Sequence, residues 1–142
     1  MYSNSSIKKY AFLAGFTLLC VLIGAGVKAQ SKPWVAPNDF TSLKNPSAGD
    51  PQSVTEGKKI YSSYCTPCHG DKGRGDGVAA AALNPKPADH SSVAMLNETD
   101  GTIFYKISEG RTPMPQYKGA LTDKQRWQLV AYIRTLYKSG KK

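Results

Sequence analysis

The chain has 142 residues, a mass of 15.4 kDa and a formal net charge of +9 at pH 7. This length holds one small domain and a targeting segment, which excludes a large enzyme of two lobes. A composition of 40% hydrophobic residues, with thirteen Gly and nine Pro, excludes a coiled coil, a collagen and a disordered acidic tail. Three cysteines are too few for a disulfide-stapled scaffold.

Residues 1–29 have the pattern of a secretory signal peptide. Lys8 and Lys9 precede an uncharged run over residues 11–27, and a short A-x-A-like site ends at Ala29. We therefore expect cleavage after Ala29 and export to the periplasm. The alternative is an uncleaved membrane anchor through residues 10–27, because a run of this length is at the short limit for a bilayer span.

Removal of the signal changes both the charge and the cysteine count. It takes away three lysines and no acidic residue, so 16 basic and 10 acidic residues remain and the net charge falls to +6. It also removes Cys20, which is interpreted as a small hydrophobic residue of the signal. The exported chain then keeps two cysteines, Cys65 and Cys68.

The exported chain begins with a proline-rich stretch over residues 30–52. It holds four prolines and has neither a helical nor an alternating period. This composition predicts an extended arm, pinned in part by Trp34 and Phe40, or else a linker.

Residues 53–142 predict an all-α domain with no strand pattern. A first helix over residues 54–64 is expected to start at an N-cap Ser53 with Glu56 in a capping box. Gly57 inside this helix indicates a close crossing with another helix. A short helix is expected over 78–83. Two longer ones are expected over 99–109, capped by Thr99 or Asp100, and over 123–137, capped by the box Thr122-x-x-Gln125.

The motif that carries chemistry is Cys65-Thr66-Pro67-Cys68-His69, the C-x-x-C-H spacing of c-type haem attachment. Two thiols three residues apart at a helix end can add to the two vinyl groups along one haem edge, and His69 then lies under the iron. A thioredoxin-like site needs a βαβ context, a zinc site needs more ligands, and a disulfide across two residues would be strained. The sequence therefore predicts one covalent haem c, which also fills the core of a very small domain.

From Val54 to Lys138 the chain resembles the small monohaem class I cytochromes c. The likeness rests on a helix with Gly57, the haem motif followed by Gly70, a Gly-rich turn, and a Pro-Met114-Pro loop before the last helix. It implies three to five helices wrapped around one covalent haem, with Gly57 and Tyr61 crossing Leu129 and Tyr132. It also implies an electron-transfer protein rather than an enzyme. The stretches 73–77 and 85–89 look like bacterial members that serve respiratory chains.

Met114 is the candidate for the sixth ligand of the iron. Two flanking prolines restrict its backbone and would hold a weak thioether ligand at low entropic cost, and the family has its axial Met at this point. His–Met ligation raises the reduction potential and leaves no open site for a substrate. The alternatives are Met95, which we interpret as a core residue, and His90, which we interpret as a surface loop residue.

The resemblance also implies a backbone carbonyl in the proline loop that fixes the tautomer of His69. Pro85 is the expected partner, with Pro87 as the alternative. The haem is expected to be buried by five apolar or aromatic side chains: Tyr61, Leu83, Phe104, Ile107 and Tyr117.

The positive charge has two interpretations. Lys72, Lys86, Arg111 and Lys118 flank the ligand loops and form a candidate docking ring for an acidic redox partner; the alternative is an ordinary solvated surface. Nucleic-acid binding is not expected, because the charge is dispersed and the chain is exported.

Three functions compete. The leading one is a mobile one-electron carrier in an exported respiratory chain, with unidentified donor and acceptor proteins. The second is a cytochrome subunit fixed in a membrane respiratory or dehydrogenase complex, with the arm over 30–52 as a docking strap. The third is a haem enzyme or gas sensor with an open sixth site, which the presence of Met114 disfavours.

Overall fold

The computed structural model describes residues 32–139, and one compact unit begins at Pro33. The expected signal peptide over 1–29, the alternative anchor through 10–27 and Cys20 lie outside the described residues. Within residues 32–139, no helix is both long and apolar enough to cross a bilayer.

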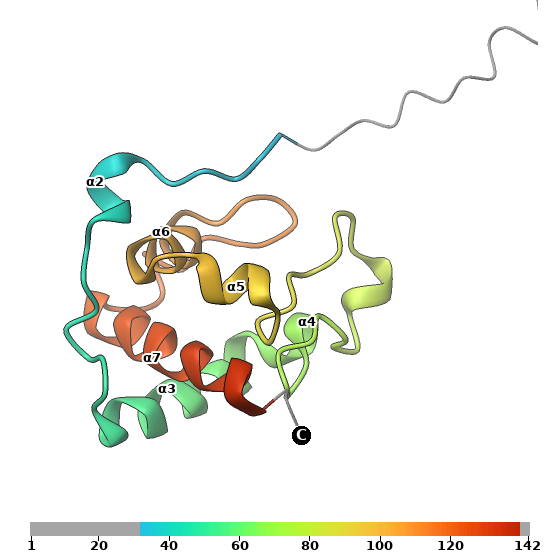
Figure 1. The fold of residues 1–142 in the computed structure, drawn as a ribbon. Coiled ribbons are helices and arrows are strands. Elements are labelled where there is room, and N and C mark those ends of the chain that lie inside the picture. Colours follow the sequence, from blue (N-terminus) through green and yellow to red (C-terminus); the bar gives the residue numbers. More distant parts are fainter. Residues whose placement is uncertain (1–31, 140–142) are drawn as a thin grey trace, which may run out of the picture. The chain divides into compact units, whose positions relative to one another are not determined.

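The described part of the chain is all-α, as expected, and contains no strand (Figure 1). Three helices are long, and the others span only one turn or little more. The short helix expected over 78–83 is a 3-10 turn of three residues, Ala80–Ala82. The other short helices have no readable period in the sequence, because four or five residues do not complete a hydrophobic stripe. In chain order the elements are α2 (Asn38–Thr41), α3 (Pro51–Tyr64), α4 (Thr66–His69), the 3-10 helix η2 (Ala80–Ala82), α5 (Val93–Asn97), α6 (Asp100–Glu109) and α7 (Asp123–Ser139).

Helix α3 starts earlier than the sequence predicted. Asp50 is the N-cap, and its carboxylate accepts hydrogen bonds from the backbone N–H groups of Gln52 and Ser53, both at 3.1 Å. Pro51 occupies the first helical position, where the missing N–H costs nothing. Ser53, the expected cap, is buried inside the first turn, so that prediction was wrong.

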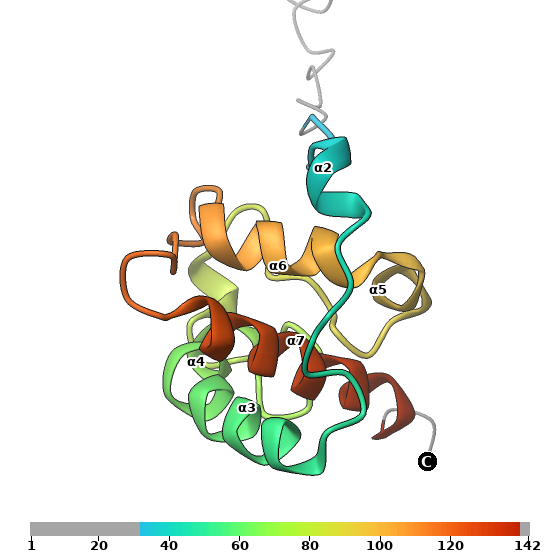
Figure 2. The same cartoon turned by 90° about the vertical axis from the view of Figure 1, so that its left-hand side faces the viewer.

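The predicted crossing of the first and last helices is confirmed. A Cβ atom added to Gly57 would overlap the carbonyl oxygen of Gln128 and lie 3.0 Å from Cβ of Tyr132. The rings of Tyr61 and Tyr132 meet edge to face at the same crossing, 5.1 Å apart. Figure 2 shows α3 directly below α7, and the two helices are in contact.

The caps of the other two long helices agree with the prediction. The Thr99 hydroxyl accepts a hydrogen bond from the N–H of Thr102 at the start of α6. At the start of α7, the backbone N–H of Gln125 donates to the Thr122 hydroxyl, and the side-chain oxygen of Gln125 accepts a hydrogen bond from the backbone N–H of Thr122. Both helices pack their apolar sides into one core with α3.

Residues 33–50 pack on the rest of this unit as a pinned arm and not as a free linker. Helix α2 contacts α6, and the ring of Phe40 lies 5.0 Å from that of Tyr105. Gly101 lets the backbone of Phe40 approach, since a Cβ there would overlap its carbonyl oxygen. Further along, Asn45 is buried and donates to the carbonyl of Trp127 at 3.2 Å.

Candidate functional site: a haem-attachment motif beside a cavity

The C-x-x-C-H motif lies where α3 ends and the one-turn helix α4 begins. Cys65 closes α3, and its carbonyl accepts hydrogen bonds from the N–H groups of Cys68 at 3.1 Å and His69 at 2.8 Å. The two cysteines thus belong to one helical turn, and both are free thiols, partly exposed. Burial, reinforced by the neighbouring Cys68, raises the pKa of Cys65 to about 12, so this thiol is protonated at neutral pH.

The imidazole of His69 is oriented by a backbone carbonyl, but not by the expected one. Its Nδ1 atom lies 3.0 Å from the carbonyl oxygen of Ala88. With the proton on Nδ1, the lone pair of Nε2 is free for a metal. The expected partner Pro85, and the alternative Pro87, lie three and one residues earlier in the loop. Burial lowers the pKa of His69, which favours the neutral form that a metal needs.

A largely apolar cavity opens beside the motif. Cys65 and His69 line it, and Met114, from the loop between α6 and α7, is also among its lining residues. Met95 of α5 lines the same cavity, so both methionines of the described residues are among its lining residues. Among the residues expected to bury a haem, Ile107 and Tyr117 line this cavity, whereas Tyr61 and Phe104 lie in the core cluster and Leu83 is half-buried.

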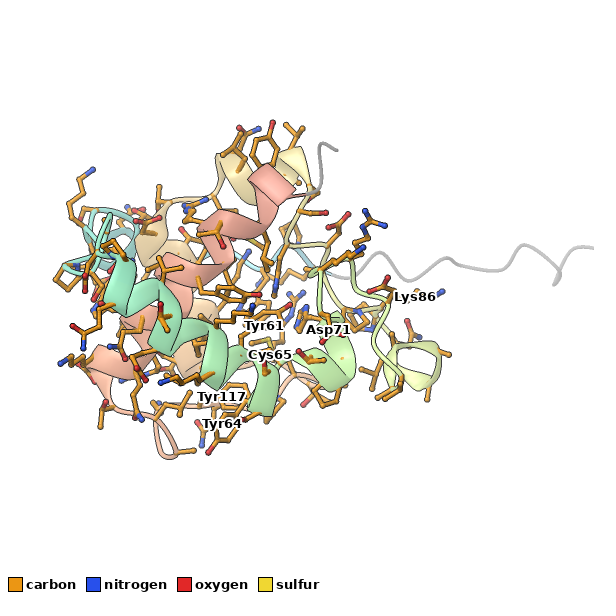
Figure 3. The ribbon with its side chains drawn as sticks, turned by 90° about the horizontal axis from the view of Figure 1, so that it is seen from below. Tyr61, Tyr64, Cys65, Asp71, Lys86 and Tyr117 are labelled. Atoms are coloured by element: carbon orange, nitrogen blue, oxygen red, sulfur yellow. The ribbon has the colours of Figure 1, made fainter. Side chains whose placement is uncertain are left out.

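The loop that carries Met114 is held by backbone hydrogen bonds. Arg111 and Met114 exchange two of them, at 2.9 and 2.8 Å, in an isolated antiparallel bridge. Further along the loop, the N–H of Tyr117 bonds to the carbonyl of Ile107 at 3.1 Å, which ties the loop back to α6. The Tyr117 hydroxyl donates to the carbonyl of Tyr64, and Figure 3 shows the two rings together beside Cys65.

His90 is the functional neighbour that sequence reasoning missed. Expected on the surface, it is buried, with 8% of its surface exposed. Its ring stacks on that of His69 at 4.1 Å and 18°, and its Nδ1 lies 3.2 Å from the hydroxyl of Tyr61. Burial, reinforced by His69, lowers the pKa of His90 to about 3, so it is neutral at ordinary pH. The surrounding sequence, Pro-Ala-Asp-His-Ser-Ser, is polar and carries no sign of this burial.

The stacking also bears on His90 as an alternative ligand. Two axial ligands of one iron each direct a nitrogen at the metal from opposite sides. The rings of His69 and His90 instead stack face to face, and in this arrangement they do not lie on opposite sides of a common metal position.

The four residues of the candidate docking ring differ in their surroundings. Lys118 pairs with Glu109 at 2.6 Å, and the guanidinium of Arg111 lies 4.8 Å from the ring centre of Trp34. Lys72 is exposed on the Gly-rich loop, and Lys86 is exposed on the proline loop, well away from Cys65 in Figure 3.

The donor set of this site fits a covalently attached haem. It combines two thiols in one helical turn, a neutral imidazole whose Nε2 is available and a thioether from another loop, and Cys65, His69 and Met114 line one apolar cavity. Soft sulfur and imidazole ligands suit iron in a haem.

Comparison with known proteins gives the same result. Residues 52–133 match the family described as "Cytochrome C oxidase, cbb3-type, subunit III". Cytochrome c6 of Synechococcus elongatus is 32% identical over 80 residues, which are 56% of this chain and 86% of that protein. The cbb3-type cytochrome c oxidase subunit CcoP of Azospirillum sp. (strain B510) is 30% identical over 105 residues, 69% of this chain and 33% of that protein.

A solved structure has the same fold. A chain of the Kuenenia stuttgartiensis reducing HAO-like protein complex superposes with a TM-score of 0.56 at 27% identity. The match covers 75% of this chain and only half of the other one. With the attachment motif, the cavity and the extent of the family match, the chain belongs to the class I cytochrome c family, whose members carry electrons.

Proposed function

We propose that this chain is a one-electron carrier in an exported respiratory chain, with a single haem c attached through Cys65 and Cys68. His69 and Met114 are its axial ligands. The observation that carries this proposal is that His69 and Met114, 45 positions apart in the sequence, line one cavity beside Cys65. Bound haem supplies a one-electron Fe(III)/Fe(II) couple.

The side chains around this cavity have separate tasks. The Ala88 carbonyl holds the proton on Nδ1 of His69 and keeps Nε2 directed for coordination. The backbone bridge with Arg111 and the two flanking prolines restrict Met114. The apolar lining, including Ile107 and Ile133, keeps water away, which favours the less charged ferrous state.

Export follows from the expected signal peptide over residues 1–29, and the proposed location is the periplasm. An uncleaved segment over 10–27 would instead anchor the domain to the membrane from that side. The partners are then a redox protein that donates the electron and another that accepts it. An acidic partner would be attracted by Lys72, Lys86, Arg111 and Lys118.

A fixed subunit of a respiratory complex is the second candidate, and the match to subunit III of cbb3-type oxidases favours it. In that case the arm over residues 30–52 is expected to serve as a docking strap. Trp34 and Phe40, the two large aromatics of this arm, instead contact Arg111 and Tyr105 of their own domain. This internal packing favours the free carrier.

Expression of the full chain together with a c-type haem maturation system tests the proposal. Mass spectrometry should find one covalent haem on a chain that begins at Gln30. Voltammetry should find one reversible one-electron wave. A ferric high-spin spectrum with ready binding of added ligands would contradict the proposal and favour an enzyme or gas sensor with an open sixth position.

A further inference from the structure

Trp34 lines the cavity although it comes from a distant part of the sequence. It lies in the arm before α2, eighteen positions ahead of the segment that matches the family. Its side chain is only partly exposed, whereas its neighbour Val35 is 75% exposed. The arm thus supplies a wall to a site that is otherwise built by α3 to α7.

Two cations lie over the ring of Trp34. The guanidinium carbon of Arg111 is 4.8 Å from the ring centre, and the Nζ atom of Lys106 is 5.7 Å from it. Both distances are within the range of cation–π attraction. Lys106 also pairs with Glu98, another lining residue of the cavity.

Arg111 connects this contact to the candidate sixth ligand. Its backbone N–H and carbonyl are both bonded to Met114, at 2.9 and 2.8 Å. The backbone positions of Arg111 and Met114 are therefore coupled through these two hydrogen bonds. Trp34 touches the side chain of the residue whose main chain holds the thioether in place.

We propose that Trp34 is a positioning residue for Met114. Its ring holds the Arg111 side chain, and the Arg111–Met114 bridge passes that constraint to the thioether; this inference rests on the proposed function. Trp34 also covers the cavity, so its loss would admit water at the side where the Met114 loop lies. Both effects favour the bond between Met114 and the iron over its displacement.

Contacts outside the cavity hold the arm, and with it Trp34, on the rest of the domain. Ala36, two positions after Trp34, is buried, and the Phe40 ring packs on Tyr105. Asn45 fixes the far end of the arm on α7. These contacts offset much of the conformational entropy that the arm loses when it is ordered. The contact between Trp34 and Arg111 therefore does not have to order the arm by itself.

Competition by added imidazole for the sixth position of the ferric holoprotein tests the proposal. Each cation–π contact corresponds to a factor of about two to five in an equilibrium constant at an exposed site. Trp34→Ala should therefore raise the apparent affinity for imidazole by about two- to fivefold or more. Trp34→Phe, which keeps an aromatic face, should restore most of the difference, and Val35→Ala should behave as the wild type.

A double-mutant cycle with Arg111→Gln separates positioning from simple packing. If Trp34 acts through Arg111, the effects of Trp34→Ala and Arg111→Gln on imidazole affinity should be clearly less than additive. If the two effects add, or if Trp34→Ala lowers thermal stability without changing imidazole affinity, the proposal is overturned.

The same samples separate this proposal from the proposed function. Mass spectrometry reports the covalent haem, and a weak ferric band near the red end of the spectrum reports a thioether on the iron. If the wild type carries haem and shows this band, but Trp34→Ala has the same imidazole affinity as the wild type, only the role of Trp34 is overturned. A wild type that lacks haem or the band overturns the proposed function, and the role of Trp34 with it.

Discussion

Gly57 of α3 lies directly against the carbonyl of Gln128 of α7, with no room for a side chain at the crossing. Gly57→Ala should therefore lower the free energy of unfolding of the holoprotein by about 1–3 kcal/mol, because the two helices must move apart. Urea titration measures this. Gly119→Ala is the matched control, since a Cβ there meets nothing within 4 Å. Equal losses in both variants would show that the crossing does not set the stability.

The two motif cysteines should be needed for covalent haem. Cys65→Ala combined with Cys68→Ala should give a chain without covalent haem and with little folded protein, because the cofactor completes the core. Mass spectrometry after acid and acetone extraction measures the attached haem. Cys20→Ala, in the expected signal, is the control and should keep the full haem mass. Haem that survives extraction in the double variant would refute the attachment.

The cap of α3 should make stability depend on pH. Hydrogen bonds from the side chain of Ser53 and from the backbone of Gln52 lower the pKa of Asp50 below its usual 3.8. A lowered folded pKa means that the stabilisation is present above pH 3.8 and is lost as the pH falls through the folded value. Asp50→Asn keeps a capping oxygen without this titration.

As the pH falls below about 4, the wild type should therefore lose more unfolding free energy than Asp50→Asn does. Urea titrations of both proteins at pH 7, 5 and 3 measure the difference. A difference that stays constant over this range would show that the cap does not titrate as the structure indicates.

Charge near the proline and glycine loops should affect electron transfer to small anions. Oxidation of the reduced protein by ferricyanide should slow as salt rises, because the Debye length falls from about 10 Å at 0.1 M to about 3 Å at 1 M. Lys72→Glu should lower this rate at low salt, and the cationic oxidant tris(phenanthroline)cobalt(III) should show the opposite trend.

Lys44, exposed on the loop between α2 and α3, provides the matched control for the charge effect. Lys44→Glu changes the net charge by the same amount but should change the ferricyanide rate much less. Equal effects of Lys44→Glu and Lys72→Glu would mean that only the net charge counts and that no docking ring exists.

The long helices and the haem motif could be predicted because their signals are local. Helices α6 and α7 begin at the expected caps, Thr99 and Thr122, since a cap depends only on residues three positions apart. Gly57 indicated the helix crossing for a similar reason: a glycine inside an apolar helical stripe needs a packing cause. The start of α3 was predicted wrongly: Asp50 and not Ser53 is the N-cap, because Pro51 favours the first helical position.

The rest of the site depends on tertiary contacts that no local pattern records. The backbone N–H of His90 donates to the carbonyl of Gly73, and the Tyr61 hydroxyl lies beside Nδ1 of the His90 ring. These two residues lie 17 and 29 positions away in the sequence, so no local pattern indicates that His90 is buried. The carbonyl that lies beside Nδ1 of His69 depends on the path of the whole proline loop. The family resemblance therefore indicated Pro85, whereas the structure has Ala88 at this position. Trp34 was placed in the arm from sequence, but its position on the cavity follows from packing of the arm on α6.

The identity of the sixth ligand is the central claim, and the ferric spectrum and reduction potential of three proteins test it most directly. The wild type should have a weak charge-transfer band near the red end of the spectrum, which reports a thioether on the iron. Met114→Ala should lose this band and lower the potential by more than about 100 mV, because the axial ligand sets the potential strongly. Met95→Leu, at the other methionine of the cavity, should keep both. Loss of the band in Met95→Leu with its retention in Met114→Ala would contradict the account and assign the iron to Met95.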